Sequence, residues 1–285
     1  MSGPADDLRV GVREWVEQVI GSVQVMADRS WAHGESFVVQ VRDGDGAEWF
    51  VKRHRNAEKH ARELAAYQHW VPALGSRAPS LRAHDTELRT LLLSSVPGAT
   101  GTADAMTPQV QYQAGELLRA LHGAAPEQPW PDFVAGQLER FEKWATRAAG
   151  LVDARSLDFG RAQVRAMAGL PAQVRLPCHM DYGPRNWLVA AGRLHVIDFE
   201  FARPRCWLED LGRLYYEPWR DHPDARTAFL AGYGRSLSDD DVGVLAALGA
   251  STAVSTIVWA REHDDPPFEE TGRRRLADLM ATADR

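Results

Sequence analysis

The stretch LPCHMDYGPRNWLVAAGRLHVIDFE, residues 176–200, decides the fold of this 285-residue chain. Two short apolar runs, 187–189 and 194–197, flank a turn sequence that contains glycine, and this pattern predicts a β-hairpin. Asn186 precedes the first run and Asp198 follows the second. Antiparallel pairing would bring these two polar side chains to the same end of the hairpin.

Three side chains of this stretch match the requirements of phosphoryl transfer. The reaction needs a carboxylate that orients and deprotonates a hydroxyl, and oxygen ligands that hold magnesium against the triphosphate. Asp181 is the candidate base, and Asn186 and Asp198 are the candidate magnesium ligands. With His179 they form H-x-D-x-x-x-x-N, the pattern of the kinase catalytic loop, followed by an aspartate on the next strand.

The first third of the chain contains candidate nucleotide-binding parts. Apolar runs at 37–41 and 48–52 flank a DGDG turn sequence and predict a hairpin that ends at Lys52. A helix is predicted over 56–70. Glu63 borders the apolar stripe of this helix and is the predicted ion-pair partner of Lys52, whereas Glu58, on the other face, ranks second.

The segment 30–36, immediately before the predicted strand at 37–41, is the candidate phosphate loop. It contains a single glycine, so we expect the backbone amides of 34–36 and the Ser36 hydroxyl to donate to phosphate. Farther along, the run 90–98 is typical of a buried strand that ends at a Pro-Gly break.

The motifs HMDYGPRN and VIDFE resemble the signature of the aminoglycoside phosphotransferase and choline kinase group, small-molecule relatives of the eukaryotic protein kinases. The resemblance extends over most of the chain. It implies a bilobal, protein-kinase-like α+β fold. A small antiparallel-sheet lobe at 1–98 would bind the nucleotide, a hinge would lie at about 93–98, and a larger, mostly helical lobe at 99–285 would carry catalysis and acceptor binding.

The resemblance also implies roles for single residues. Lys52 would contact the α- and β-phosphates, and the Ser94 carbonyl and the Val96 amide would bind adenine. His179 would order the catalytic loop rather than transfer protons. Asp210 would hold this loop by hydrogen bonds, with a helix N-terminal cap as its alternative role.

Several departures separate the sequence from protein kinases. Glu200 stands where the glycine of a DFG motif would be, no APE motif follows, and Gly183 replaces the lysine expected two residues after the base. The acceptor is therefore expected to be a small molecule rather than a protein. Met180 stands where many relatives have glycine, and we expect it to alter packing beneath the loop.

The C-terminal half is predicted to be mostly helical, because apolar residues recur there at helical spacing. The segments with this spacing are 109–123, 138–151, 157–170, 208–219, 224–236, 238–263 and 267–283.

Composition excludes several classes of protein. A hydrophobic content of 45% with 25% charged residues is typical of globular proteins, and a net charge of −6 argues against nucleic-acid binding. We expect no run to approach the roughly 20 apolar residues of a membrane span, and the N-terminus carries acids where a signal peptide would be apolar. We therefore expect a cytoplasmic protein without a membrane partner. Two cysteines, Cys178 and Cys206, cannot form a disulfide framework.

The acceptor site is the least defined part of the sequence. The candidates share polar or aromatic side chains in the larger lobe: Glu200, Arg203, Tyr215, Trp259, Glu262, His263, Asp264 and Asp265. The acidic residues at 262–265 would either bind amines or form a solvated helix end.

These observations favour an ATP-dependent O-phosphotransferase that uses Mg²⁺, with GTP not excluded as donor. The expected acceptor is a hydroxylated antibiotic of the aminoglycoside or a related type, including nucleoside or peptide antibiotics. A metabolite such as choline, a sugar or an amino alcohol is the alternative. A metal-dependent hydrolase using His179, Asp181, His195 and Asp198, and a nucleotide-binding pseudoenzyme, are the alternatives from other classes. Monomer and homodimer both stay open.

Overall fold

Five antiparallel strands form the sheet of the N-terminal lobe in this computed structural model, which describes residues 10–30, 36–100 and 103–283. The strands lie in the order β1-β2-β3-β5-β4. Their bounds are Val23–Asp28 (β1), Ser36–Asp43 (β2), Glu48–His54 (β3), Leu81–Asp85 (β4) and Thr90–Ser94 (β5).

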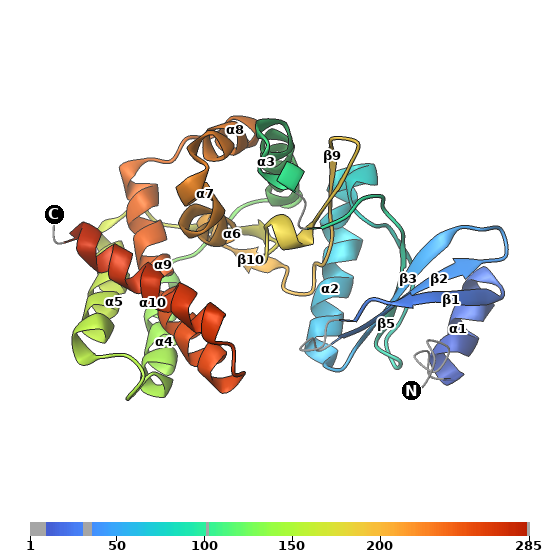
Figure 1. Cartoon of the computed structure of the whole chain (residues 1–285), viewed down its shortest axis with the longest axis horizontal. Coiled ribbons are helices and arrows are strands. Elements are labelled where there is room, and N and C mark those ends of the chain that lie inside the picture. The colour runs from blue at the N-terminus through green and yellow to red at the C-terminus, as the bar shows by residue number, and fades with distance from the viewer. Residues whose placement is uncertain (1–9, 31–35, 101–102, 284–285) are drawn as a thin grey trace.

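One face of this sheet packs against α1 (Val10–Ile20), and the other face looks toward the second lobe (Figure 1). Valines of both elements fill a small separate core: Val12, Val16, Val23, Val39, Val41 and Val51. Because neighbouring side chains of a strand point to opposite faces, Lys52 points away from this core. The predicted strands at 37–41 and 48–52 are confirmed, and Lys52 lies on the cleft side of the sheet.

Helix α2 (Ala57–His69) follows β3 within the first lobe and confirms the helix predicted over 56–70. Asn56 begins it, because its side-chain oxygen accepts hydrogen bonds from the amides of Glu58 and Lys59. Tyr67 is buried in the main core, and Glu63 is fully buried toward the sheet.

The second lobe is mostly helical, as predicted (Figure 1). Its helices are α3 (Pro108–His122), α4 (Phe133–Arg147), α5 (Ala154–Ala166), α6 (Trp207–Tyr216), α7 (Pro218–Asp221), α8 (Pro223–Tyr233), α9 (Asp239–Glu262) and α10 (Pro266–Ala283). Helix α4 begins five residues before the predicted start at 138, because the buried Phe133 already belongs to its apolar face.

Two small sheets carry the stretch that decides the fold. The predicted hairpin is confirmed as β8 (Trp187–Ala190) and β9 (Arg193–Val196). Ala191 and Gly192 both have positive φ, which suits a tight hairpin turn. A second sheet has the order β10-β7-β6, with β6 at Gln128–Pro129, β7 at Val174–Cys178 and β10 at Arg203–Arg205. Strand β7 therefore leads directly into the candidate catalytic loop.

Helix α9 corrects one expectation from the sequence. The uncharged run 242–259 makes α9 long and apolar enough to cross a membrane, although no such run was expected. In the structure, 67% of an apolar 18-residue segment of α9 is buried inside the protein. There α9 packs against α10, α5 and α6. A core helix passes the same test of length and composition, so this run is weak evidence for a membrane span.

The chain crosses between the lobes just after β5. Ala99 forms backbone hydrogen bonds with Val189 of β8 in both directions, so the crossing segment lies against the hairpin. Gly98 has a φ of 122°, and a Cβ there would lie 2.9 Å from backbone atoms of Leu188 and Val189. Glycine is therefore required at the predicted Pro-Gly break by conformation and by space.

Helices α3 and α8 approach each other closely enough to exclude side chains between them. A Cβ on Gly115 would lie 2.0 Å from the Phe229 carbonyl oxygen, and one on Gly232 would lie 2.0 Å from the Tyr112 carbonyl oxygen. The two helices lie side by side at the edge of the second lobe (Figure 1).

We predict that Gly232→Ala lowers the free energy of unfolding by about 1–3 kcal/mol, because the added methyl group forces the two helices apart. Gly136→Ala is the matched control, since a methyl group on this exposed helical glycine would have no atom within 4 Å. The control should raise the free energy of unfolding by roughly 0.5–1 kcal/mol. Urea unfolding followed by circular dichroism measures both, and equal effects would contradict the close contact.

Candidate active site

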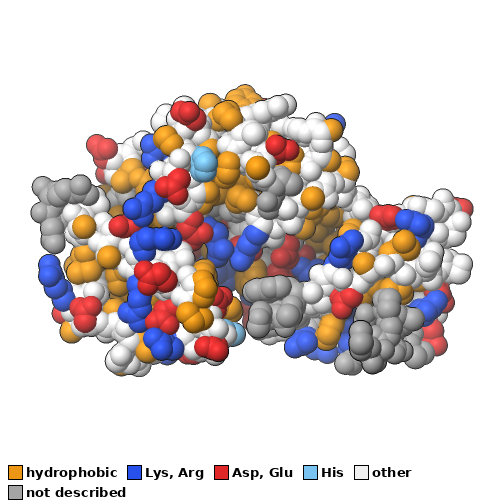
Figure 2. Space-filling view, in the orientation of Figure 1, with side chains coloured by type: hydrophobic (Ala, Val, Ile, Leu, Met, Phe, Trp, Pro, Cys, Tyr) orange, Lys and Arg blue, Asp and Glu red, His pale blue; other side chains and the backbone are white. Residues whose placement is uncertain are grey.

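A cavity of about 810 Å³ lies between the sheet and the second lobe. Its volume is within the range of small-molecule sites. Apolar side chains of both lobes line it, among them Val38, Phe50, Leu93 and Leu188. The polar lining includes Lys52, Asn186 and Asp198, together with the hinge residues Ser94 and Val96. Figure 2 shows the surface hollowed between the lobes, with both basic and acidic side chains in the hollow.

Lys52 is the centre of an ion-pair network that joins the lobes. Its Nζ lies 2.9 Å from a Glu63 carboxylate oxygen, 2.6 Å from Asp198 Oδ1 and 3.5 Å from Glu200 Oε2. The Lys52 side chain is 8% exposed and that of Glu63 is fully buried. His54 Nε2 adds a contact of 2.6 Å to Glu63. The predicted Lys52–Glu63 pair therefore exists, and Glu58 instead pairs with Arg62 at the surface.

Burial and charge act in opposite directions on these groups. Burial alone would lower the pKa of Lys52, but the carboxylates of Asp198, Glu63 and Glu200 raise it well above its ordinary value. Burial would raise the pKa of Glu63 and of Asp198, yet the Lys52 ammonium outweighs it and lowers both. All three groups are therefore charged at neutral pH.

The candidate catalytic loop holds the Asp181 carboxylate in one position. Asn186 Nδ2 donates to Asp181 Oδ2 at 2.7 Å, and Arg185 Nε donates to the same oxygen at 2.9 Å. The Asp181 side chain is 7% exposed, whereas that of Arg185 is 50% exposed. Arg185 was not among the predicted site residues, although its spacing of four residues from Asp181 was a usable signal.

The hairpin brings the two candidate metal ligands together, as its pattern predicted. The Asn186 carbonyl accepts from the amide of Ile197, the residue before Asp198, at 3.0 Å. The side-chain NH₂ of Asn186 donates hydrogen bonds to Asp181. The side-chain oxygen of Asn186 is therefore the atom that can bind a ligand. Asp198 adds carboxylate oxygens to the same end of the hairpin. This all-oxygen donor set fits magnesium.

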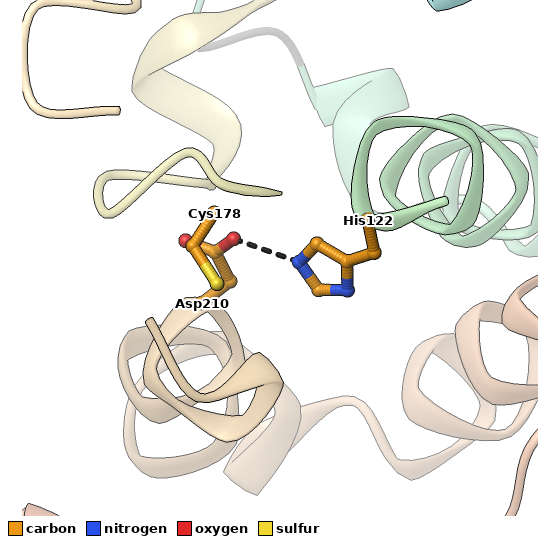
Figure 3. Close-up of side chains that lie close together, drawn as sticks. All are labelled: His122, Cys178 and Asp210. Atoms are coloured by element: carbon orange, nitrogen blue, oxygen red, sulfur yellow. Dashed lines mark hydrogen bonds and ion pairs between the residues drawn. The ribbon is translucent and has the colours of Figure 1, made fainter. Parts of the chain in front are cut away.

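Asp210 of α6 holds the start of the candidate catalytic loop by hydrogen bonds. Its carboxylate accepts from the backbone amides of His179, at 2.8 Å, and Met180. Figure 3 shows His122 pointing at Asp210, and their contact is 3.0 Å. The alternative role of Asp210 as an N-terminal cap is wrong, because α6 begins after Cys206.

His179 and Met180 show how the loop is constrained. His179 is fully buried, and its Nε2 lies 3.0 Å from the Ile197 carbonyl oxygen, so it connects the loop to the segment before Asp198. Met180 has a φ of 67°, a left-handed conformation that glycine adopts without strain. This conformation therefore favours glycine at position 180.

The hydrolase alternative lacks a suitable cluster. Within the described parts of the chain, the groups of potential metal ligands are His122 with Cys178 and Asp210, and His54 with Glu63 and Glu200. Figure 3 shows the first group, in which Asp210 already accepts from two loop amides. Lys52 already neutralises the carboxylates of the second group. The quartet His179, Asp181, His195 and Asp198 is not among these groups.

The remaining predicted residues have other surroundings. The Ser36 hydroxyl donates to Glu200 Oε2 at 2.8 Å, and residues 31–35 of the candidate phosphate loop lie outside the described residues. Of the acceptor candidates, Glu200 lines the cavity, and the others do not: Arg203, Tyr215, Trp259, Glu262, His263, Asp264 and Asp265. Glu262 forms a surface ion pair with Arg147, and His263 stacks on Trp259. These contacts favour the solvated helix end for 262–265.

Together, the sheet, the Lys–Glu pair and the Asp-Asn-Asp set define a protein-kinase-like fold with the site of a small-molecule kinase. A model of the phosphotransferase enzyme family matches residues 29–248, which is more than half of the chain. The chain belongs to this family. No curated protein sequence matches it.

Solved structures with the same fold include three kinds of small-molecule kinase. A thermostable mutant of aminoglycoside phosphotransferase APH(4)-Ia is 17% identical with a TM-score of 0.72, covering 95% of this chain and 99% of that one. Macrolide 2'-phosphotransferase MphH from Brachybacterium faecium is 16% identical, with a TM-score of 0.68 and coverage of 95% and 98%. A Plasmodium vivax ethanolamine kinase is 13% identical, with a TM-score of 0.63 and coverage of 93% and 85%.

We predict that Lys52→Met lowers the free energy of unfolding at pH 7.5 by about 3–5 kcal/mol, because it leaves the buried Glu63 carboxylate without its cation. In the wild type, the lowered pKa of Glu63 gives stability above its unfolded pKa of about 4.3 that is lost as pH falls through the folded pKa. In Lys52→Met the folded-state pKa of Glu63 rises, because burial is no longer offset by the lysine, so Glu63 takes up a proton on folding. The difference in free energy of unfolding between wild type and Lys52→Met should therefore be smaller at pH 5.0 than at pH 7.5.

Urea unfolding at both pH values measures this difference. Lys143→Met is the matched control, because Lys143 is 72% exposed and pairs only with a neighbouring helix residue at the surface. Its effect should stay within about 0.5 kcal/mol at either pH. A difference for Lys52→Met that is small, or that widens toward pH 5.0, would show that Lys52 does not neutralise Glu63.

Proposed function

We propose that the protein transfers the γ-phosphate of ATP to a hydroxyl group of a small molecule. The supporting observation is a continuous series of contacts that links Asp181 to three residues of the cavity lining, Asn186, Asp198 and Lys52. Asn186 binds Asp181, the Asn186 carbonyl binds the residue before Asp198, and Asp198 binds Lys52. A base, an oxygen ligand pair and a phosphate-binding cation are thereby held as one unit.

The nucleotide would lie between the two lobes, with residues 1–98 as its binding lobe and 99–285 as the catalytic lobe. The purine would contact the apolar lining, and the Ser94 carbonyl and Val96 amide would bind its edge. Lys52 would anchor the α- and β-phosphates. Related structures hold ADP with hygromycin B, or GDP with kanamycin, which supports a purine nucleotide. ATP is the proposed donor, and GTP is the alternative.

Catalysis would then depend on the position of Asp181. Arg185 and Asn186 orient its carboxylate, which accepts the hydrogen bond of the acceptor hydroxyl. The hydroxyl oxygen bonds to the γ-phosphorus, the bond from that phosphorus to the β,γ-bridging oxygen breaks, and the hydroxyl proton passes to Asp181. Magnesium, held by Asn186 and Asp198, would offset the charge of the phosphates.

For the acceptor, we propose a hydroxylated antibiotic of the aminoglycoside or a related natural-product type, so that phosphorylation confers resistance in the cytoplasm. Aminoglycoside and macrolide phosphotransferases share the fold and support this assignment. A metabolite alcohol is the second candidate, because an ethanolamine kinase has the same fold. ATP consumption measured across antibiotics, amino alcohols and sugars separates the two candidates.

We predict that Asp181→Asn lowers kcat by about 10²–10⁴-fold, because the amide cannot accept the hydroxyl proton. Calorimetry should show Mg-ATP binding within about threefold of wild type, since the fold and Lys52 are unchanged. Asp158→Asn is the control, because this carboxylate is 75% exposed on α5. Near-normal turnover in Asp181→Asn would rule out its role as base.

We predict that Asp198→Ala removes the magnesium dependence of ATP binding. The wild type should bind ATP more tightly with magnesium than with EDTA, because Asp198 supplies an anionic ligand. In the variant the two titrations should agree within about threefold. A magnesium effect of wild-type size in Asp198→Ala would exclude Asp198 as a metal ligand.

A further inference from the structure

Arg203 is a cation whose burial is not explained by the ion pairs around it. It begins β10, five residues after Asp198, and is only partly exposed. Its Nε is buried without a hydrogen-bond partner among the described residues. A buried, charged hydrogen-bond donor without an acceptor is costly, so such a group needs an explanation.

Neighbouring cations surround Arg203 on the same face of the strand. Arg205, two residues on, lies 3.1 Å from Glu209, and Arg140 of α4 lies 3.3 Å from the same carboxylate. Glu209 therefore already forms ion pairs with two guanidinium groups other than that of Arg203. Burial, and then the guanidinium groups of Arg205 and Arg62, lower the pKa of Arg203. Because guanidinium stays protonated in proteins, this cost would be relieved by a bound anion.

The position of Arg203 places it beside the proposed chemistry. Arg203 pairs with Cys178 of β7, and Asp181 is the third residue after Cys178. Three residues of chain span at most about 11 Å. On the other side, Lys59 of α2 lies 4.6 Å from the ring of Phe201 and 3.5 Å from Glu200, which itself contacts Lys52. Arg203 therefore follows, within three residues, a segment that contacts both α2 and the Lys52 network.

We propose that Arg203, with Arg62 beside it, binds a carboxylate or phosphate group of the acceptor. The acceptor would then carry an acidic group in addition to the hydroxyl that Asp181 deprotonates. Guanidinium suits this task because its planar fork matches both anions with paired hydrogen bonds. This inference narrows the acceptor proposed above, because the site would select acidic natural products or acidic metabolites over polycationic aminoglycosides.

This inference rests on the proposed kinase function for the identity of the ligand, but the anion site itself can be tested without turnover. Inorganic phosphate and malonate are titrated calorimetrically at constant ionic strength, with saturating Mg-AMP-PNP present so that the nucleotide site is occupied. The wild type should show one saturable site for at least one of the two anions. Arg203→Gln should weaken that binding at least tenfold.

Two further variants separate binding from folding. Arg203→Lys keeps the charge but loses the fork, so its affinity for the anion should fall between those of wild type and Arg203→Gln. Arg220→Gln is the matched control, because this arginine is 53% exposed and pairs with Asp278 on the surface, and its titration should equal that of wild type. Anion binding that is absent from the wild type, or equal in wild type and Arg203→Gln, would overturn the proposal.

Acceptor preference supplies the second test. Turnover is compared within matched sets that differ in one group: glucose, glucuronate and glucose 6-phosphate, and glycerol and glycerate, with kanamycin as the polycation. The acidic members should have kcat/KM at least tenfold higher than their neutral partners. In Arg203→Gln, the loss should appear as a KM at least tenfold higher for the acidic acceptor, with kcat and the KM for ATP nearly unchanged.

The two proposals fail in different ways. Preference for the neutral or cationic acceptors, or an equal effect of Arg203→Gln on all acceptors, would overturn the anionic acceptor while leaving the kinase assignment intact. If Asp181→Asn keeps wild-type turnover, the proposed mechanism fails, and the phosphate and malonate titrations still decide the anion site. If no acceptor in the sets is phosphorylated, the phosphate and malonate titrations still decide whether Arg203 forms an anion site.

Discussion

The contact of Lys52 with Glu63 and Asp198 is the interaction on which the rest of the structure depends. The lysine comes from the sheet, Glu63 from α2, and Asp198 from the end of the hairpin in the other lobe. A buried ammonium is stable only with carboxylates around it, and buried carboxylates are stable only with their cation. The ammonium and the carboxylates therefore stabilise one another. The relative position of the two lobes at the cavity is thus linked to the charge of Lys52.

The same network explains why the site has strained backbone next to it. Asp198 has a φ of 66° and Met180 one of 67°, both unfavourable for residues with a side chain. Each is held by a polar contact, Asp198 by Lys52 and Met180 by the Asp210 carboxylate. Asp210 is held in turn by His122, whose other ring nitrogen contacts the Tyr233 hydroxyl at 2.8 Å. Strain at the site is thus offset by a buried polar chain that extends from the loop to α8.

Local patterns made the hairpin, the N-terminal strands and the helices predictable, because apolar spacing determines which face of each element is buried. Asn186 and Asp198 could be placed together from the same pattern, since pairing alone brings the ends of a hairpin into contact. Contacts between distant segments carry no such pattern. The bonds of Ser36 to Glu200 and of Arg77 to the Leu194 carbonyl, the latter linking residues 117 positions apart, depend on how the lobes pack. The run 242–259 shows the same limit, because an apolar helix of that length suits either a membrane or a protein core, and only tertiary packing distinguishes them.

Charge distribution matters more for the acceptor than the net charge of −6, which by itself would favour a cationic partner. Net charge averages over the whole surface, whereas recognition depends on the groups within a few ångströms of the ligand. Glu200, an acidic residue of the cavity lining, already binds the Ser36 hydroxyl and contacts Lys52 and Lys59. Glu209 is occupied by Arg140 and Arg205. The carboxylates beside the site are thus neutralised by the protein itself, while the Arg203 Nε has no acceptor among the described residues, so the local field there favours an anion.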